Sequence, residues 1–310
     1  MAKRRYGRYS VDTSREDKVL FPKSSISKGD LIDYYERISD HILPHLSDRP
    51  LVLQRFPDGI GEDGFYQKQS SDYFPDWIET TSVKVASSNG DQDLVVCNNT
   101  ATIVYLANQA CITMHPWLSR TDRIDHPDQL VVDLDPPSDD FEEARSAALR
   151  LKALFEELEL PSFPKLTGSK GIHVHVPLDR SDDFDEVRGI ARSMMKVLAD
   201  RHPDTLTTEQ RKNKRGNRLF LDVGRNAYAQ TAVAPYSVRP REGAPVAAPV
   251  RWEELQQAGL ESRSFTIGNV FRRLGQIDDP WEGWRRRARS LRAAKKRLEA
   301  IAASSAEEGS

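Results

Sequence analysis

The spacing of apolar residues along the chain predicts a mixture of helices and short strands. Apolar side chains recur at helical spacing between residues 31 and 38, so we predict a helix that begins at Ser27. Residues 141–158 and 184–199 show the same amphipathic pattern. Short apolar runs predict buried strands at 51–53, 130–135, 172–177 and 218–223. The pattern therefore favours two strand-and-helix units in the middle of the chain, and we find no internal repeat.

A β-hairpin is predicted between residues 83 and 97. Residues 83–87 and 94–97 read as its two strands, and Asn89-Gly90 between them is a strong hairpin turn. We expect the tip of this hairpin to project into solvent. Further elements are a helix at 102–109, a strand at 110–113, a Pro-rich extended stretch at 235–249 and a helical tail from Trp281.

Length and charge narrow the class of protein. The chain has 310 residues, enough for one large domain or two modest ones. Its 45 lysines and arginines against 47 acidic residues leave a formal charge of -2, which excludes a uniformly basic nucleic-acid coat. No apolar run approaches the ~20 residues that span a bilayer, and the charged N-terminus is not a secretory signal, so we expect a cytoplasmic protein. Cys97 and Cys111 lie in apolar segments and are expected to be reduced thiols.

Three aspartates at strand ends are candidates for chemistry. Asp133 and Asp135 lie two residues apart on one predicted strand, so both side chains project from the same face. For this pair alone, solvated carboxylates or a cap for the next helix is the simpler explanation. Asp222 ends a second apolar strand in the same way, and three such carboxylates can hold two Mg²⁺ or Mn²⁺ ions for phosphoryl or nucleotidyl transfer.

The turn at 167–171 has the composition of a phosphate-binding loop. Thr167, Ser169 and Lys170 stand among two glycines, although the spacing is not that of a P-loop. His173 and His175 point to one face of the next strand, where a structural and a functional role are about equally supported. Beside Lys170, we favour phosphate contact by His173.

Cations follow Asp222 at positions that suit a triphosphate. Arg225 and Arg239 could each bind two phosphate oxygens, and Gln230 lies between them. For any one arginine, a surface salt bridge is the simpler interpretation.

An aromatic pair and two lysines in the first quarter of the chain suggest contacts with nucleic acid. Phe65 and Tyr66 follow a loop that begins at Arg55 and could stack on bases, although we expect one ring to pack in the core. Lys28 lies at a predicted helix start, where a phosphate is favoured, and Lys18 lies ten residues earlier.

Six motifs occur in order along the chain. They are R-F-P-D-G at 55–59, H-P-W at 115–117, V-D-L-D-P at 132–136, G-S-K-G-I-H-V at 168–174, L-F-L-D at 219–222 followed by Arg225-Asn226, and A-V-A-P-Y-S-V-R at 232–239. Together, over roughly residues 15–280, they closely resemble the polymerase domain of bacterial ligase D, a member of the archaeo-eukaryotic primase superfamily.

The resemblance implies an α/β (α+β) fold in one compact unit. A primase-type catalytic core with an RRM-like sheet would lie beside an N-terminal mixed α/β subdomain. The catalytic domain would cover residues 1–284, with the N-terminal part at 1–125 and the metal-binding core at 126–284, followed by a basic tail at 285–310.

The resemblance also implies an activity and its partners. The activity would be template-dependent nucleotidyl transfer at double-strand breaks in non-homologous end joining, with two Mn²⁺ or Mg²⁺ ions and a preference for ribonucleotides. The substrates would be NTPs or dNTPs and DNA with 5′-phosphorylated gaps or 3′ overhangs. The partners would be Ku and a separate ligase. The protein would be a monomer in the cytoplasm, associated with the bacterial nucleoid.

Carried over by position, the resemblance assigns roles to individual residues. Asp133 and Asp135 would bind both metal ions, and Asp222 the ion that activates the primer 3′-hydroxyl. Lys18 and Lys28 would receive the downstream 5′-phosphate, and the hairpin at 83–97 would help to align two broken ends. Phe65 and Tyr66, with Arg55, would meet the template. The incoming nucleotide would be held by His115, Thr167, Ser169, Lys170, His173, Arg225, Gln230 and Arg239.

Some features depart from the family pattern or leave alternatives open. Thr167 stands where the family commonly has serine, and Met114 stands where an acidic residue is expected. No Lys-x-Asp-Gly adenylation motif occurs, so we expect a stand-alone polymerase. The alternatives are a non-catalytic module that bridges DNA ends and a metal-dependent nuclease or phosphohydrolase. The basic tail from Arg285 suits a solvated helix face and a DNA contact equally well.

Overall fold

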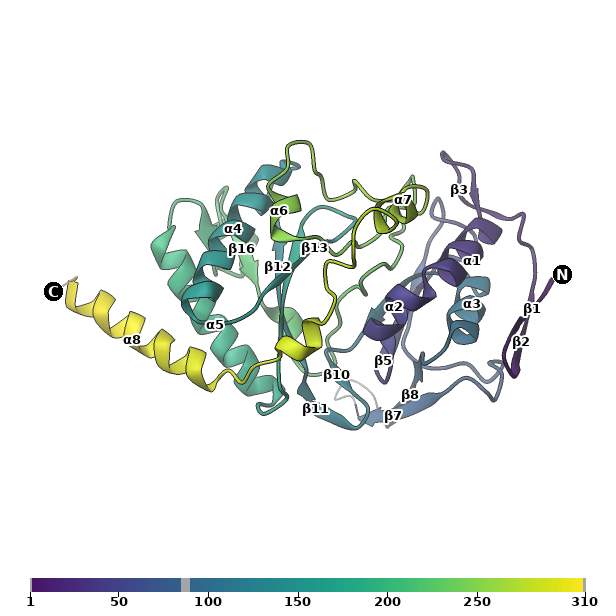
Figure 1. Cartoon of the computed structure of the whole chain (residues 1–310), viewed down its shortest axis with the longest axis horizontal. Helices are drawn as coiled ribbons and strands as arrows, with labels where there is room; N and C mark the ends of the chain where they lie inside the picture. Colours follow the sequence, from purple (N-terminus) through teal and green to yellow (C-terminus); the bar gives the residue numbers. More distant parts are fainter. Residues whose placement is uncertain (1, 85–89, 309–310) are drawn as a thin grey trace. The chain divides into compact units, whose positions relative to one another are not determined.

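The computed structural model describes residues 2–84 and 90–308, and its contacts divide the chain into two units (Figure 1). Unit 1 consists of Met1–Asp122, Thr231–Ala248 and Arg263–Asp279. Unit 2 consists of Arg123–Gln230, Pro249–Ser262 and Pro280–Ser310. The chain passes from unit 1 to unit 2 after Asp122, and two later segments return to unit 1.

Unit 1 is built around a five-stranded antiparallel sheet. The strand order is β6-β5-β8-β7, and β9 pairs with β5. Among the described residues, four helices and two small hairpins complete the unit, and Leu31, Tyr35 and Ile112 are fully buried in its core. The strands are β1 (Ala2–Tyr6), β2 (Tyr9–Thr13), β3 (Val19–Phe21), β4 (Ile26–Ser27), β5 (Pro50–Arg55), β6 (Phe65–Gln67), β7 (Thr80–Lys84), β8 (Asp91–Val96), β9 (Cys111–Pro116) and β10 (Ser119–Arg120); the helices are α1 (Lys28–Arg37), α2 (Ser39–Leu46), α3 (Thr100–Asn108) and α7 (Val270–Leu274).

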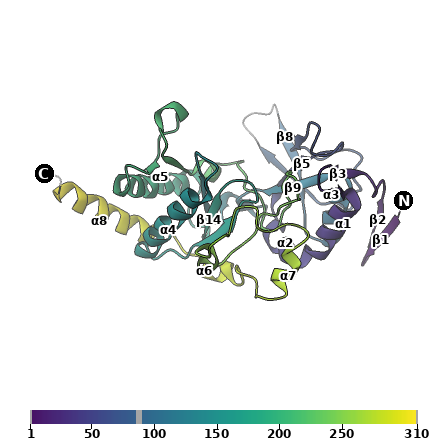
Figure 2. The same ribbon diagram turned by 90° about the horizontal axis from the view of Figure 1, so that it is seen from above.

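Unit 2 contains a second five-stranded sheet, in the order β13-β14-β12-β16-β15. The pair β15 and β16 is parallel and the other pairs are antiparallel. Helix α4 packs on β12 and β14, and Figure 2 shows it beside β14. The elements are β11 (Arg123–Pro127), β12 (Gln129–Asp135), α4 (Phe141–Glu157), β13 (Phe163–Leu166), β14 (Ile172–Pro177), α5 (Phe184–Arg201), β15 (Leu206–Thr207), η1 (Lys212–Lys214), β16 (Leu219–Asp222), η2 (Gly224–Asn226), α6 (Trp252–Leu255), η3 (Trp284–Arg287) and α8 (Arg292–Glu308).

Local sequence signals explain where the principal helices begin. Ser27 caps α1 in a capping box with Asp30, as the predicted helix start requires. Asp140 accepts a hydrogen bond from the backbone of Glu142 at the start of α4, and Asp183 forms a capping box at the start of α5. The predicted mixed α/β fold is confirmed.

The predicted hairpin is present as the antiparallel pair β7 and β8. Asn89, half of its predicted turn, lies outside the described residues, and so does the rest of 85–89. Cys97 and Cys111 are buried thiols without a disulfide, and burial raises the pKa of Cys111 to about 12. Among the described residues, no helix combines the length and apolarity needed to cross a bilayer.

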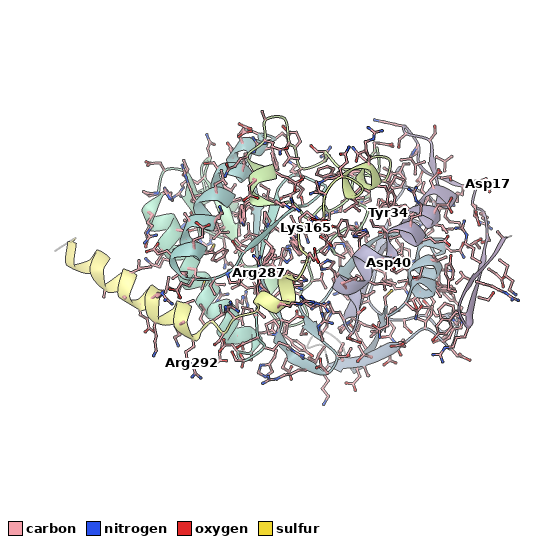
Figure 3. The ribbon with its side chains drawn as sticks, viewed as in Figure 1. Asp17, Tyr34, Asp40, Lys165, Arg287 and Arg292 are labelled. Carbon is pink, nitrogen blue, oxygen red and sulfur yellow. The ribbon has the colours of Figure 1, made fainter. Side chains whose placement is uncertain are left out.

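The prediction of a helix from Trp281 onward is wrong for its first eleven residues. Trp281 and Trp284 are buried and pack around Phe163, and Gly283 between them has a left-handed φ of +68°. This buried aromatic cluster holds the chain in a short 3₁₀ turn. Helix α8 therefore begins at Arg292, which is labelled in Figure 3.

Candidate active site

A row of charged side chains crosses the sheet of unit 2. Asp133 in the central strand β12 lies directly opposite Asp222 of β16 on one side and His173 of β14 on the other. His173 is in turn opposite Lys165 of β13. Residues directly opposite each other point to the same face of a sheet, and so does Asp135, two positions along β12. The predicted convergence of the three aspartates is therefore supported by the strand register.

Asp133 is the most deeply buried of the three aspartates; Arg225 compensates its charge, and His173 lies beside it. The guanidinium of Arg225 contacts Oδ2 of Asp133 through Nη2 at 2.6 Å and Nε at 2.8 Å. Nε2 of His173 lies 3.4 Å from Oδ1. Burial by itself would raise the pKa of Asp133, but His173 and Arg225 outweigh it and hold that pKa well below its usual range. Asp133 is thus an anion at neutral pH.

His173 is the neutral member of this group. Its burial lowers its pKa, although the nearby carboxylate of Asp133 opposes that effect. Nε2 is the ring nitrogen that faces Asp133, 3.4 Å from Oδ1, but among the described residues this oxygen is buried without a hydrogen-bond partner. Nδ1 is buried and has no hydrogen-bond partner in the described part of the chain. His173 therefore lies beside Asp133 without adding a positive charge.

Arg225 is the cation around which the three carboxylates gather. Burial opposes its charge, but Asp133, followed by Asp222 and Asp135, raises its pKa above the ordinary arginine value. Asp222 also accepts a hydrogen bond from the backbone N–H of Gly224 at 2.7 Å, which ties the strand end to the turn that carries Arg225.

Asn226 positions that turn, and the sequence analysis assigned it no role. Strand β16 ends at Asp222, so the backbone of Val131 would lose its next strand partner. The buried amide of Asn226 takes that place: its Oδ1 accepts from Val131 N–H at 2.8 Å and its Nδ2 donates to Val131 C=O at 2.7 Å. A third bond, from Nδ2 to Val223 C=O at 2.9 Å, closes the turn itself. The side chain of Asn226 thus extends the sheet by one residue and places Arg225 next to Asp133.

The three aspartates have the chemistry of a divalent-cation site. Their carboxylates are hard oxygen donors on one face of the sheet, and Asp133 is buried there as an anion. In the residues that the structure describes, no three carboxylate, imidazole or thiol groups are already arranged around a common metal position. Instead, the guanidinium of Arg225 compensates Asp133.

The turn at 167–171 is held against the end of β12. A Cβ atom on Gly171 would lie 2.0 Å from Leu134 C=O and 2.6 Å from Oδ1 of Asp135, so glycine is required there. The hydroxyl of Thr167 accepts from the backbone N–H of Ser169 and Gly171, at 3.3 Å and 3.2 Å. Thr167 therefore shapes the turn that presents Lys170.

Ser262 closes the same turn and was missed by the sequence analysis. Its backbone C=O accepts from Gly168 N–H at 3.1 Å, and its hydroxyl donates to Gly171 C=O at 3.1 Å. No local motif marks Ser262, because it reaches the turn from more than ninety residues away.

The other predicted residues of unit 2 have different surroundings. Lys170 is exposed and pairs with Asp139 at 2.9 Å. His175 faces Gln129, with Nδ1 at 2.9 Å from Oε1, and packs on Trp281, so the two histidines of this strand have separate environments. Gln230 is exposed, and its backbone N–H donates to Ala227.

Unit 1 carries the remaining candidates for nucleotide binding. His115 lies in β9 opposite Val52 and is 8% exposed. Its ring centre is 5.7 Å from that of Tyr66. Arg239 is partly exposed, and its backbone N–H donates to Pro245.

Lys18 and Lys28 lie together in unit 1, as the sequence suggested. The backbone N–H of Lys28, the first residue of α1, donates to Lys18 C=O at 2.7 Å. The ammonium of Lys28 is buried and donates to Asn108 C=O at 3.2 Å. Burial first, and then the neighbouring Arg15 and Lys18, lower the pKa of Lys28. Lys18 itself pairs with the exposed carboxylate of Asp58 at 2.6 Å.

The expectation that Phe65 or Tyr66 packs in the core is wrong. The two residues are 47% and 58% exposed. Strand β6 lies at the edge of the sheet, where it pairs with β5 through Arg55 and Gln54, so neither ring is covered by another strand. The guanidinium of Arg55 lies 5.5 Å from the centre of the Phe65 ring.

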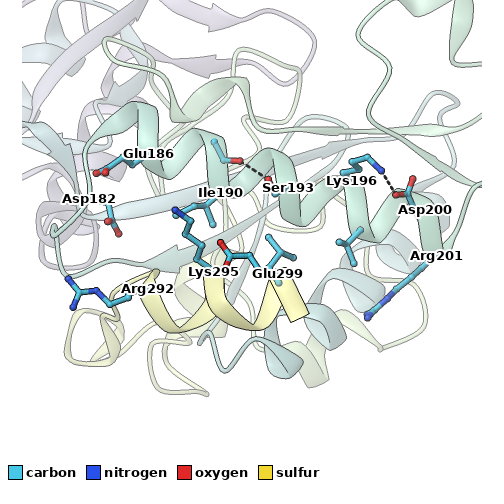
Figure 4. Close-up of a pocket in the computed structure, with 13 residues that line it drawn as sticks. Asp182, Glu186, Ile190, Ser193, Lys196, Asp200, Arg201, Arg292, Lys295 and Glu299 are labelled. Carbon is cyan, nitrogen blue, oxygen red and sulfur yellow. Dashed lines mark hydrogen bonds and ion pairs between the residues drawn. The ribbon is translucent and has the colours of Figure 1, made fainter. Parts of the chain in front are cut away.

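Two of the cavities on unit 2 bear on the site, one because it borders an aspartate and one because it does not. One, of about 650 Å³, borders Asp222 and is lined by the basic side chains of Arg188, Arg192, Lys196 and Arg215. Arg188 and Arg192 are four residues apart on α5, a spacing that could have marked them as one face of a helix. The other, of about 1110 Å³, lies between α5 and α8 and is lined by side chains of both signs (Figure 4). None of the three aspartates borders this second cavity.

Comparison with known proteins places these observations in a family. Residues 27–281 match the family described as the LigD primase-polymerase domain. The chain is 35% identical over 268 residues to the bifunctional non-homologous end joining protein LigD of Bacillus subtilis, covering 86% of this chain and 42% of that protein. It is 31% identical over 272 residues to the multifunctional LigD of Mycolicibacterium smegmatis, covering 87% of this chain and 35% of that protein. A solved structure, the polymerase domain of Mycobacterium tuberculosis ligase D in complex with DNA, matches with a TM-score of 0.83 at 28% identity, covering 90% of this chain and 99% of that one.

Proposed function

The chain belongs to the LigD primase-polymerase domain family, a family of nucleotidyl transferases, and we propose that it is a template-dependent polymerase that repairs DNA double-strand breaks. It would fill gaps and extend 3′ ends in bacterial non-homologous end joining, with a preference for ribonucleotides. The chain spans less than half of the length of the LigD proteins that it matches. We propose Ku and a ligase as its partners at the DNA end. We propose that it is associated with the nucleoid.

The register of Asp133 opposite Asp222, with Arg225 between the carboxylates, is the observation that carries this proposal. Members of the family depend on a divalent metal, and Asp133, Asp135 and Asp222 are the residues that would hold it. We propose two ions, Mn²⁺ in preference to Mg²⁺, with Asp133 and Asp135 shared between them and Asp222 on the primer side. Such ions would supply charge neutralisation at the phosphates and a lowered pKa at the primer 3′-hydroxyl.

The chain's own residues would bind and orient the incoming nucleotide. The side chain of Arg225 is 36% exposed, so triphosphate oxygens can reach its guanidinium. Lys170 is held by an exposed partner, Asp139, which a phosphate can displace. Neutral His173 lies beside Asp133 and adds no positive charge. We assign Thr167, Ser169 and Gln230 to nucleotide binding as well, with Thr167 acting through the shape of its turn, and we propose a nucleotide-binding role for His115 and Arg239 of unit 1.

The basic cavity beside Asp222 suits the primer strand. Arg188, Arg192 and Arg215 line it, and a strand whose phosphates follow these side chains would bring its 3′ end to Asp222. This contact would be independent of sequence, as extension of arbitrary broken ends requires.

In unit 1, we propose two contacts with the DNA. Lys18 and Lys28 would receive the 5′-phosphate of the downstream strand, where the N-terminus of α1 adds its partial positive charge. Phe65 and Tyr66 would stack on template bases, supported by Arg55.

Primer extension on a gapped duplex tests the proposal. The duplex carries a downstream 5′-phosphate, and the reaction contains Mn²⁺ and either ribo- or deoxyribonucleotides. We expect extension by the wild type and by Asp204→Asn, a control with an exposed carboxylate in the same unit, and none by Asp133→Asn. Lys28→Ala should weaken binding and extension only when the 5′-phosphate is present.

Two results would change the assignment. If the wild type binds the gap but extends nothing with either nucleotide, the non-catalytic end-bridging role replaces the polymerase. If it shortens the primer instead, the protein is a nuclease.

A further inference from the structure

Exposed large apolar side chains gather in unit 1. In the described ranges, the four with the greatest exposure are Val19, Phe65, Tyr66 and Tyr73, and all four belong to this unit. Tyr73 is 60% exposed, more than either ring of the aromatic pair. Nothing in the family resemblance assigns a role to Tyr73.

The guanidinium of Arg55 contacts both Tyr73 and Phe65. The side chain of Arg55 is buried at the end of β5, where Nε donates to Gln109 C=O at 2.9 Å. Nη1 donates to the hydroxyl of Tyr73 at 2.8 Å, and the guanidinium carbon lies 5.5 Å from the centre of the Phe65 ring. One buried guanidinium therefore supports both exposed rings.

Side-chain hydrogen bonds and a buried neighbour hold the segment that carries Tyr73. Arg55 also donates to Oε1 of Gln67, and Nε2 of Gln67 donates to Gln69 C=O and to the hydroxyl of Ser71. The next residue, Phe74, is buried and packs edge-to-face against Tyr73. Tyr73 is thus held at its hydroxyl and at one edge while most of its surface faces solvent. A ring held in this way loses little conformational entropy when a ligand stacks on it.

We propose that Tyr73 is a third stacking side chain for the unpaired template strand. The rings of Phe65 and Tyr73, which share the guanidinium of Arg55, would then contact bases of single-stranded nucleic acid in addition to any contact made by Tyr66. Stacking on such rings tolerates any base, which agrees with a surface that offers rings rather than a set of base-reading hydrogen bonds. This inference rests on the proposed function, because it assumes that the aromatic pair meets the template.

Fluorescence anisotropy with two labelled DNA duplexes tests the proposal. One duplex ends in a 5′-phosphate beside a 3′ overhang of several thymidines, and the other has the same sequence but a blunt end. We expect Tyr73→Ala to weaken binding of the overhang by about five-fold or more, from the ~1–3 kcal/mol that one stacked base contributes. Binding of the blunt duplex should stay within two-fold, since it offers no unpaired base.

Tyr73→Phe separates stacking from the hydrogen bond to Arg55. This variant keeps the ring and loses the hydroxyl, so it should bind the overhang nearly as well as the wild type. If both variants lose affinity equally, or if Tyr73→Ala binds the overhang like the wild type while melting at the same temperature, the stacking role is refuted.

A fluorescent base gives a readout that does not depend on the stability of a variant. The fluorescent base 2-aminopurine is placed at one overhang position at a time. We expect wild-type protein to change the emission of 2-aminopurine at several positions. At one of these positions, the double variant Phe65→Ala, Tyr66→Ala should still change the emission. If that double variant abolishes the change at every position, Tyr73 contacts no base. Primer extension by the wild type is measured in parallel: if it fails, the polymerase proposal falls, whereas a loss of stacking with extension intact refutes only the role of Tyr73.

Discussion

Replacing Asn226 by alanine should remove the support that holds Arg225 beside Asp133. The substitution deletes three hydrogen bonds, two to Val131 and one to Val223. Val223 C=O still accepts a hydrogen bond from the backbone N–H of residue 226, at 3.1 Å. The backbone N–H and C=O of Val131, which is fully buried, lose the side-chain amide of Asn226 as their hydrogen-bond partner. Each buried polar group left unsatisfied costs ~1–3 kcal/mol, so for these two groups we expect a loss of about 2–6 kcal/mol in the free energy of unfolding.

The matched control is Asn98→Ala. Asn98 also makes two side-chain hydrogen bonds, to Asp48 and Glu79, but it is only half-buried, so water can replace them. We expect this variant to lose less than about 1 kcal/mol. Urea unfolding gives the free energies, and hydrogen exchange of the β12 peptide reports on the N–H of Val131 directly.

Catalysis should respond as well. At a temperature where Asn226→Ala is folded, primer extension should fall much more than in Asn98→Ala, because Arg225 is no longer fixed beside Asp133. If the two variants unfold at the same urea concentration and exchange β12 equally fast, the side chain of Asn226 does not complete the sheet and the reasoning is refuted.

Three further predictions concern the turn at 167–171 and the lysine pair. Gly171→Ala should abolish extension while duplex binding persists in an anisotropy assay, because its Cβ would lie 2.0 Å from Leu134 C=O and displace the strand end that carries Asp135; retained activity would show that β12 can yield. Asp58→Asn should tighten binding of 5′-phosphorylated DNA relative to 5′-hydroxyl DNA, because Asp58 occupies the ammonium of Lys18; unchanged discrimination would count against it. Burial lowers the pKa of Lys28, so the affinity for the 5′-phosphate should fall as the pH rises through that lowered pKa, before an ordinary lysine would lose its charge. Lys28→Arg should remove this pH dependence, because arginine stays protonated. The same anisotropy titration, repeated between about pH 7 and pH 10, checks both expectations.

The strand pattern of the active site could be predicted from sequence, but its register could not. The alternation along 130–135 placed Asp133 and Asp135 on one face, because the side-chain period of a strand is fixed by its backbone. That Asp222 lies directly opposite Asp133 depends on where β16 pairs with β12, and no local signal sets that register. The grouping of the three aspartates was predicted because all three end apolar strands, but that pattern does not say which residues lie opposite one another.

Residues that act through distant backbone contacts were the ones that sequence reasoning missed. Asn226 and Ser262 bond to segments more than ninety residues away, and neither stands in a pattern that predicts such a bond. The aromatic pair was misjudged for a related reason: two adjacent apolar residues normally place one ring in the core, but β6 is an edge strand and both rings stay exposed. The tail helix was predicted too long because Trp281 and Trp284 pack against Phe163, a residue of unit 2 far earlier in the sequence.

The charge balance of the carboxylate row bears on how the proposed site would hold both cations and a triphosphate. Asp133, Asp135 and Asp222 surround one guanidinium, that of Arg225, so two negative charges are left uncompensated among these four groups. His173 adds no charge because its pKa is lowered by burial. One divalent cation would therefore neutralise the group, and a second would make it positive, which favours the arrival of an anionic nucleotide. A protonated histidine at position 173 would reduce this negative charge, so a neutral, buried His173 favours the binding of cations at the proposed site.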